Sequence, residues 1–217
     1  MDSYLYALIS TFVPEHFKIL TFLAGGRLVK EERDNCTYAN GVLHSFDDKP
    51  AVIDPYGTQM WYKYGELHRD GDKPALIYTN ETQWWYKNGK VHREGDLPAI
   101  IRADGYQAWY KNGEQHRDGD LPAVICLDGT RYWFKNGKYH RDGDLPAVIE
   151  MDGTSVWWKN GKRHRDGDLP AVIEADGSQK WYKNGELHRD GDLPALIWAD
   201  GTQGCYKNGE QYFPNLN

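Results

Sequence analysis

The sequence is poor in the residues that mark the commonest chemistries. It has 3 cysteines, Cys36, Cys126 and Cys205, and none of them belongs to a Cys-x-x-Cys pair. A small, odd number of cysteines excludes a disulfide framework and favours a reducing, intracellular compartment. No apolar run approaches the ~20 residues that cross a bilayer, and no secretory signal opens the chain. We therefore expect neither a membrane-spanning helix nor secretion.

An excess of basic residues is also missing. Lys and Arg total 26 against 32 Asp and Glu, which gives a formal net charge of −6. Proteins that bind nucleic acids need a basic face to neutralise phosphates, so we expect no nucleic-acid partner. Serine is sparse, and no glycine-rich phosphate loop precedes a helix. The sequence predicts no catalytic residues, no metal and no cofactor, and hence a protein that is not an enzyme.

What the sequence has in abundance is repetition. Stretches close to "WYKNGELHRDGDLPA" recur along the chain, and histidines recur every 24 residues. The histidines of this series are His44, His68, His92, His116, His140, His164 and His188. Tyr212 occupies the next equivalent position, so the last copy is degenerate. A period of this length indicates a stacked repeat architecture.

Glycine and proline occur at fixed positions in the repeat. Twenty of the 23 glycines lie at three places in the unit: after the Asn of "KNG", inside "RDGD", or in the "DG" before Thr or Ser. Asn-Gly and Asp-Gly between extended segments predict hairpin turns, where glycine adopts a positive φ. Seven of the 10 prolines share one position before an "AVI"-like segment, where each is expected to begin a strand.

These features predict an all-β repeat array. Identical repeats must enter and leave in the same direction, so an antiparallel sheet needs an even number of strands per repeat. Two strands fit into 24 residues, whereas the four strands of a propeller blade do not. We predict an elongated, twisted antiparallel sheet of stacked hairpins over residues 35–217, with about seven repeats.

The unit "DGTxxWYKNGxxH" resembles MORN-type repeats, and the resemblance covers residues 36–217. The departure is "HRDGDLPA", which looks like the MORN-like arrays of large DNA viruses. The resemblance implies a viral protein in the host cytoplasm or in the virion. MORN-type proteins serve as spacers, scaffolds, dimerisation modules and sometimes lipid-associated elements, so the resemblance favours a scaffold.

The "HRDGD" boxes admit two interpretations. Asp residues around a glycine could bind Ca²⁺ through their oxygens, and the His series could bind zinc. Alternatively, Arg and Asp of adjacent boxes form a charge ladder, in which His is a hydrogen-bonding rung. We favour the ladder because a calcium loop needs more oxygens. The residues assigned to the ladder are His68, His92, His116, His140, His164 and His188, with Trp61, Trp85, Trp109, Trp133, Trp157 and Trp181.

Each of these tryptophans is followed by Tyr, Phe or Trp. Neighbouring residues of a strand face opposite sides of the sheet, so two aromatic columns are expected. Burial as the core is the favoured interpretation, because a single sheet has no other means of burying area. Pockets for glycans or quaternary amines between the aromatic rings are the alternative.

The positions that vary between copies are candidates for recognising a partner. The large apolar ones are Trp84, Tyr132, Tyr139 and Trp198. Exposed aromatic residues often anchor interfaces, although each could instead fill a groove in the sheet.

The first 34 residues differ from the rest. Leu5, Leu8, Ile9 and Phe12 have helical spacing. A second helix is predicted from Pro14 to Gly25-Gly26. Residues 1–34 would then be a helical cap over the first strand or a docking segment for a protein, with Leu5, Leu8 and Phe12 as contacts. A membrane surface is disfavoured, because no Lys/Arg-rich face accompanies the apolar one.

The function predicted from the sequence is that of a non-enzymatic scaffold. Its partners would be other proteins, namely further copies of itself or components of the virion or host. The alternative is a ligand-binding repeat module that holds glycans or Ca²⁺ between its aromatic and Asp-rich repeats.

Overall fold

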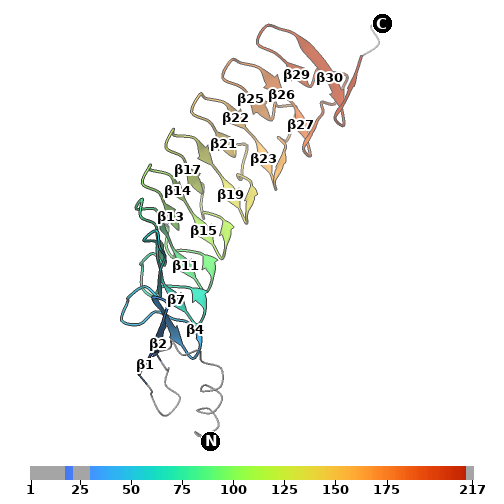
Figure 1. Cartoon of the computed structure of the whole chain (residues 1–217). Helices are drawn as coiled ribbons and strands as arrows, with labels where there is room; N and C mark the ends of the chain where they lie inside the picture. Colours follow the sequence, from blue (N-terminus) through green and yellow to red (C-terminus); the bar gives the residue numbers. More distant parts are fainter. Residues whose placement is uncertain (1–17, 22–29, 214–217) are drawn as a thin grey trace, which may run out of the picture. The chain divides into compact units, whose positions relative to one another are not determined.

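The protein folds as stacks of short β-hairpins (Figure 1). The structure, a computed structural model, describes residues 18–21 and 30–213. Within these ranges every regular element is a strand, and no helix long and apolar enough to cross a membrane occurs. The chain divides into two compact units, Met1–Lys90 and Val91–Asn217, and each is considered by itself.

Each repeat contains four short strands, here called A to D in chain order. The A strands are β5 (Val52–Ile53), β9 (Leu76–Ile77), β13 (Ile100–Ile101), β17 (Val124–Ile125), β21 (Val148–Ile149), β25 (Val172–Ile173) and β29 (Leu196–Ile197). The B strands are β6 (Gln59–Met60), β10 (Gln83–Trp84), β14 (Gln107–Ala108), β18 (Arg131–Tyr132), β22 (Ser155–Val156), β26 (Gln179–Lys180) and the first part of β30 (Gln203–Lys207).

The C and D strands form the second half of each repeat. The C strands are β7 (Tyr62–Lys63), β11 (Tyr86–Lys87), β15 (Tyr110–Lys111), β19 (Phe134–Lys135), β23 (Trp158–Lys159) and β27 (Tyr182–Lys183). The D strands are β8 (Glu66–Leu67), β12 (Lys90–Val91), β16 (Glu114–Gln115), β20 (Lys138–Tyr139), β24 (Lys162–Arg163), β28 (Glu186–Leu187) and β31 (Glu210–Tyr212).

The A and B strands form an antiparallel ladder that joins one repeat to the next. In the second unit, β18 pairs with β17 of its own repeat and with β21 of the following one. Tyr132 lies opposite both Val124 and Val148. In the second unit, β14, β18, β22 and β26 therefore each have an A strand on either side, and the A strands that flank them are separated by two strand spacings.

The C and D strands form separate two-stranded hairpins, such as β19–β20. The tryptophan of each repeat connects the ladder to the hairpin. The Trp133 N–H donates to the Ala147 carbonyl at 2.8 Å, and the Trp133 carbonyl accepts from the His140 N–H at 3.1 Å. The two strands predicted per repeat are thus present, but each is divided in two. The first predicted strand corresponds to B and C, and the second corresponds to D and the following A strand.

The turns follow the predicted glycines. All twenty glycines at the three repeat positions have positive φ, as predicted. In the β19–β20 hairpin both Asn136 and Gly137 have positive φ, 51° and 71°, which is the type I′ arrangement. At the A–B turn the Asp128 Oδ1 accepts from the Thr130 N–H at 2.9 Å. Turn chemistry therefore fixes the repeat length.

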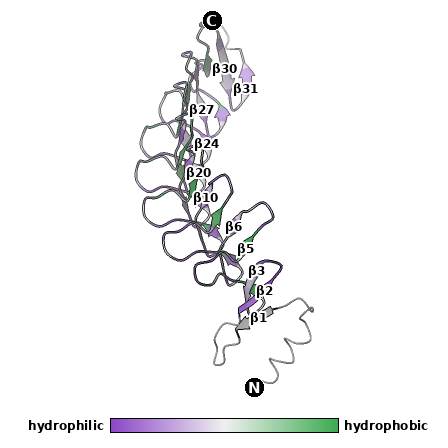
Figure 2. Ribbon diagram, turned by 60° about the vertical axis from the view of Figure 1, so that its left-hand side comes forward, coloured by the Kyte–Doolittle hydropathy of each residue, from purple (hydrophilic) through white to green (hydrophobic). Residues whose placement is uncertain are grey.

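The core of each unit consists of stacked tryptophan and alanine residues. The alanines before the A strands are fully buried: Ala51, Ala75, Ala99, Ala123, Ala147, Ala171 and Ala195. The repeated tryptophans, Trp61 to Trp181, are buried too, with exposed fractions of 3–9%. Alanine lets the backbone of one repeat approach the indole of the next. Figure 2 shows hydrophobic residues on the short strands and hydrophilic ones on the loops that project from them.

The N-terminal region differs in part from the prediction. Lys18–Thr21, inside the second predicted helix, forms strand β1, which pairs antiparallel with β2 (Lys30–Arg33). Strand β2 also pairs with β3 (Cys36–Ala39), which in turn pairs with β4 (Val42–Leu43). Pairing with the open edge of β2 outweighs local helical preference here. The rest of the predicted cap, including Leu5, Leu8 and Phe12, lies outside the described residues.

Candidate functional site

The histidine of each "HRDGD" box links two repeats. The Nδ1 of His140 accepts the backbone N–H of Asn160, in the following repeat, at 3.1 Å. The Nε2 of His140 lies 3.0 Å from the Asp142 Oδ1. Because Nδ1 is an acceptor, the ring proton must be on Nε2, which then donates to Asp142. The same backbone contact is made by His68, His92, His116, His164 and His188.

The arginine of each box forms the second inter-repeat link. Arg141 donates to both carboxylate oxygens of Asp120, in the preceding box, at 2.5 and 2.8 Å. It also donates to the Pro146 carbonyl at 3.3 Å and lies 4.0 Å above the Trp133 ring. Arg69, Arg117, Arg165 and Arg189 make equivalent contacts. This is the geometry of a charge ladder that covers the tryptophan column.

The lysines of the C strands pair with the first aspartate of each box. Lys135 Nζ lies 2.8 Å from the Asp142 Oδ2, and Lys63, Lys111, Lys159 and Lys183 are placed alike. The carboxylates named here are therefore already bound by Lys, His or Arg. Among the residues that the structure describes, no three His, Cys, Asp or Glu side chains are arranged to hold a metal ion.

Because the box carboxylates accept hydrogen bonds in their charged form, we expect the protein to lose stability in acid. The hydrogen bonds from Lys135 and then His140 lower the pKa of Asp142, and those from His188 and Lys183 lower the pKa of Asp190 to about 2. A depressed pKa adds stability above the unfolded value of 3.8, and this contribution is lost as the pH falls through the folded value. We expect the melting temperature to fall between pH 4 and about pH 2. A melting temperature that is constant across this window, measured by circular dichroism, would contradict the ladder.

A second set of side chains forms a stacked column on the face opposite the tryptophans. We call Phe134, Tyr139, Trp158, Arg163 and Tyr182 the aromatic column. The Tyr139 ring lies between Phe134 and Trp158, with centroid distances of 4.2 and 5.0 Å. The Arg163 guanidinium lies 5.4 Å from the Trp158 ring and 5.4 Å from the Tyr182 ring. The stack arises because C-strand and D-strand residues face each other: Phe134 is opposite Tyr139, and Trp158 is opposite Arg163.

The aromatic column packs over a floor of buried valines. Val148, Val156 and Val172 are 5–7% exposed, and Tyr132, Tyr139, Trp158 and Tyr182 pack against them. One B-strand position alternates in size along this face: it is Tyr132, then Val156, then Lys180. The small valine between two long side chains leaves a hollow of about 460 Å³ with Val156 and Val172 in its lining.

The walls of this hollow are charged. They carry four carboxylates, Glu150, Asp152, Glu174 and Asp176, and two cations, Arg163 and Lys180. Lys180 is paired with Glu174 at 2.5 Å, and Arg163 lies 3.4 Å from the Tyr182 hydroxyl. Hydrogen bonds from Ser178 lower the pKa of Asp176. The hollow therefore has a net negative charge at neutral pH.

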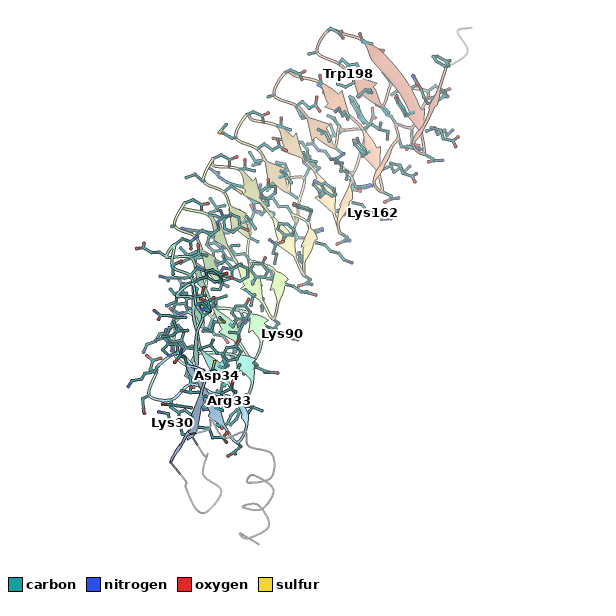
Figure 3. All side chains as sticks on the ribbon, in the orientation of Figure 1. Lys30, Arg33, Asp34, Lys90, Lys162 and Trp198 are labelled. Carbon is teal, nitrogen blue, oxygen red and sulfur yellow. The ribbon has the colours of Figure 1, made fainter. Side chains whose placement is uncertain are left out.

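The structure separates the four aromatic residues that the sequence singled out. Tyr132 and Tyr139 lie together, with ring centroids 5.9 Å apart. Trp84 lies in the first unit, stacked 6.2 Å from Tyr86. Trp198 is 40% exposed, with Lys180 Nζ 5.1 Å from its ring. Figure 3 shows Trp198 directly after β29 and Lys162 at a C–D hairpin tip, near opposite edges of the second unit.

The sequence predicted a second aromatic column from the residues that follow the repeated tryptophans, to which Phe134 and Trp158 belong, but sequence reasoning missed Arg163 and Val156 as parts of this face. The signal that could have found them is the C–D hairpin, whose two-residue Asn-Gly turn sets which residues face each other.

The comparisons with known proteins give no match: no family model, no curated protein and no solved structure resembles the chain. The resemblance to MORN-type repeats therefore stays a prediction from the sequence motif.

Proposed function

We propose that the protein is a non-enzymatic scaffold that binds another protein through the aromatic column of its second unit. The observation that carries this proposal is the column itself, with the hollow beside it. The repeated His, Arg, Lys and Asp side chains are engaged with one another along the array. Phe134, Trp158 and Tyr182 occupy the aromatic position that follows each repeated tryptophan, whereas Tyr139 and Arg163 share a position that varies between copies. This variable position is available for specificity.

The composition of the column suits a protein partner. Tyr, Trp and Arg dominate the energetics of protein–protein interfaces because they offer large, stiff contact areas with polar ends. Tyr132, Tyr139 and Trp158 are half-buried, so their positions are fixed while part of each ring remains accessible. A fixed ring loses little conformational entropy on binding.

Changing Tyr139 to Gln tests the proposal. Gln115 occupies the equivalent position one repeat earlier, so the fold accommodates this side chain. The matched control is Leu169→Lys, because Lys73 occupies that position in another copy. In affinity capture from native lysate with quantitative mass spectrometry, partners recovered by the wild type should fall at least tenfold with Tyr139→Gln, since hot-spot losses exceed about 1.4 kcal/mol. Leu169→Lys should recover them normally. Equal recovery by both variants, or no specific partner, would contradict the proposal.

A further inference from the structure

We propose that the aromatic column and its hollow recognise a proline-rich segment in the polyproline II conformation that carries a basic residue. This inference rests on the proposed function and specifies the chemistry of the partner. Polyproline segments dock on aromatic-lined surfaces, and their preformed conformation lowers the entropic cost of binding.

The spacing of the column fits this conformation. Successive C-strand rings, such as Phe134, Trp158 and Tyr182, belong to consecutive repeats. Consecutive A strands are two strand spacings apart, which is about 9.6 Å. A polyproline II helix has three residues per turn and advances about 9.3 Å per turn. Prolines at every third residue would therefore meet equivalent places on consecutive repeats.

The polar groups of the face complement such a peptide. A polyproline II backbone makes no internal hydrogen bonds, so its carbonyls need donors from the protein. In the described part of the chain, no hydrogen bond from the hydroxyl of Tyr132 or Tyr139 is found. Both hydroxyls are therefore free to donate to peptide carbonyls.

The carboxylates of the hollow determine where the basic residue of the peptide would lie. The hollow over Val156 and Val172 has four carboxylates and two cations in its walls. Glu174 already pairs with Lys180, and Arg163 is held between the Trp158 and Tyr182 rings. Glu150 has no side-chain ion pair among the described residues and faces solvent at the rim of the hollow. An Arg or Lys of the peptide that enters over the Val156 floor would meet uncompensated negative charge.

The test is fluorescence anisotropy of labelled peptides with the full chain. The probe is Arg-Ala-Pro-Ala-Ala-Pro-Ala-Ala-Pro, with one counterpart that begins with glutamate and another in which glycine replaces every proline. We expect saturable binding of the probe below about 1 mM, at least fivefold weaker binding of the glutamate peptide, and at least tenfold weaker binding of the glycine peptide.

Two protein variants locate the site. Val156→Tyr fills the hollow with the side chain found at Tyr132, so the fold should be preserved, and the preference for arginine over glutamate should disappear. Tyr139→Gln should weaken all proline peptides at least tenfold, whereas Leu169→Lys should bind like the wild type. Melting temperatures of the variants report whether each remains folded.

Several outcomes would overturn the inference. The first two are binding of the probe that does not saturate and equal affinity for the proline and glycine peptides. The third is a Val156→Tyr variant that still binds the arginine peptide more tightly than the glutamate peptide. The fourth is displacement of the probe by neutral hexasaccharides at a lower concentration than by unlabelled peptide. If the proline peptides do not bind while partner capture still depends on Tyr139, this inference is wrong and the scaffold proposal stands. If the peptide binds but no protein partner is captured, the scaffold proposal fails instead.

Discussion

Replacing Trp157 by alanine is expected to lower the free energy of unfolding by about 3–5 kcal/mol, as large-to-small changes of buried aromatic residues do. Trp157 is 9% exposed, and the Arg165 guanidinium lies 3.9 Å above its ring. Its backbone connects the ladder to the C–D hairpin through bonds to Ala171 and His164. The loss would be measured by urea unfolding, followed by tryptophan fluorescence and circular dichroism.

The control for this prediction is Trp157→Phe. The indole Nε1–H of Trp157 is buried without a hydrogen-bond partner among the described residues, so phenylalanine removes an unpaired polar group while it keeps much of the ring. We expect a loss of about 1–2 kcal/mol. A loss for alanine that does not exceed the loss for phenylalanine would show that the tryptophan column is not the core.

Replacing Gly161 by valine is expected to lower the free energy of unfolding by about 1–3 kcal/mol, which is the second large effect. Gly161 has φ +80°, which a β-branched residue adopts only with strain. An added Cβ would lie 3.6 Å from the Lys138 Cβ, and the Gly161 N–H donates to the Tyr139 carbonyl at 2.9 Å. The substitution therefore disturbs both the turn and its link to the preceding repeat.

Arg163→Ala, two residues away, is the matched comparison. Arg163 is exposed, and its contacts with Trp158 and Tyr182 amount to about 1 kcal/mol at such a site. Differential scanning calorimetry of both variants should give a clearly larger loss of melting temperature for Gly161→Val. Comparable losses would mean that the Asn-Gly turn does not fix the hairpin.

Much of the fold could be predicted because glycines mark the turns in every repeat. A positive φ at Gly137 or Gly161 has few alternatives to a turn, and symmetry requires an even number of strands. The pairing of Arg141 with Asp120 follows from stacking consecutive boxes. These features depend on residues near in sequence or one period apart.

The aromatic residue after each tryptophan predicts a second aromatic column, but the stacking of Tyr139 and Arg163 within it, and the hollow, could not be predicted in this way. They depend on which variable residue faces a C-strand ring across a hairpin, as Tyr139 faces Phe134, and on the ring of the next repeat against which it stacks, which for Tyr139 is Trp158. The hollow arises because Val156 is smaller than Tyr132 before it and Lys180 after it. The alanine column was overlooked because a small residue carries little pattern signal, although close packing demands it. In Lys18–Thr21, edge pairing outweighed the helical pattern.

We propose that the repeated residues hold the array together, whereas residues at variable positions determine which partner binds. Tyr139 and His140 are adjacent in sequence but belong to the two different sets. The most direct test measures both the melting temperature and partner capture for Tyr139→Gln and His140→Ala. We predict that Tyr139→Gln loses the partner and stays folded, whereas His140→Ala leaves the Asn160 N–H without its side-chain acceptor, melts lower than the wild type and keeps the partner. The same pattern of losses in both variants would contradict the claim.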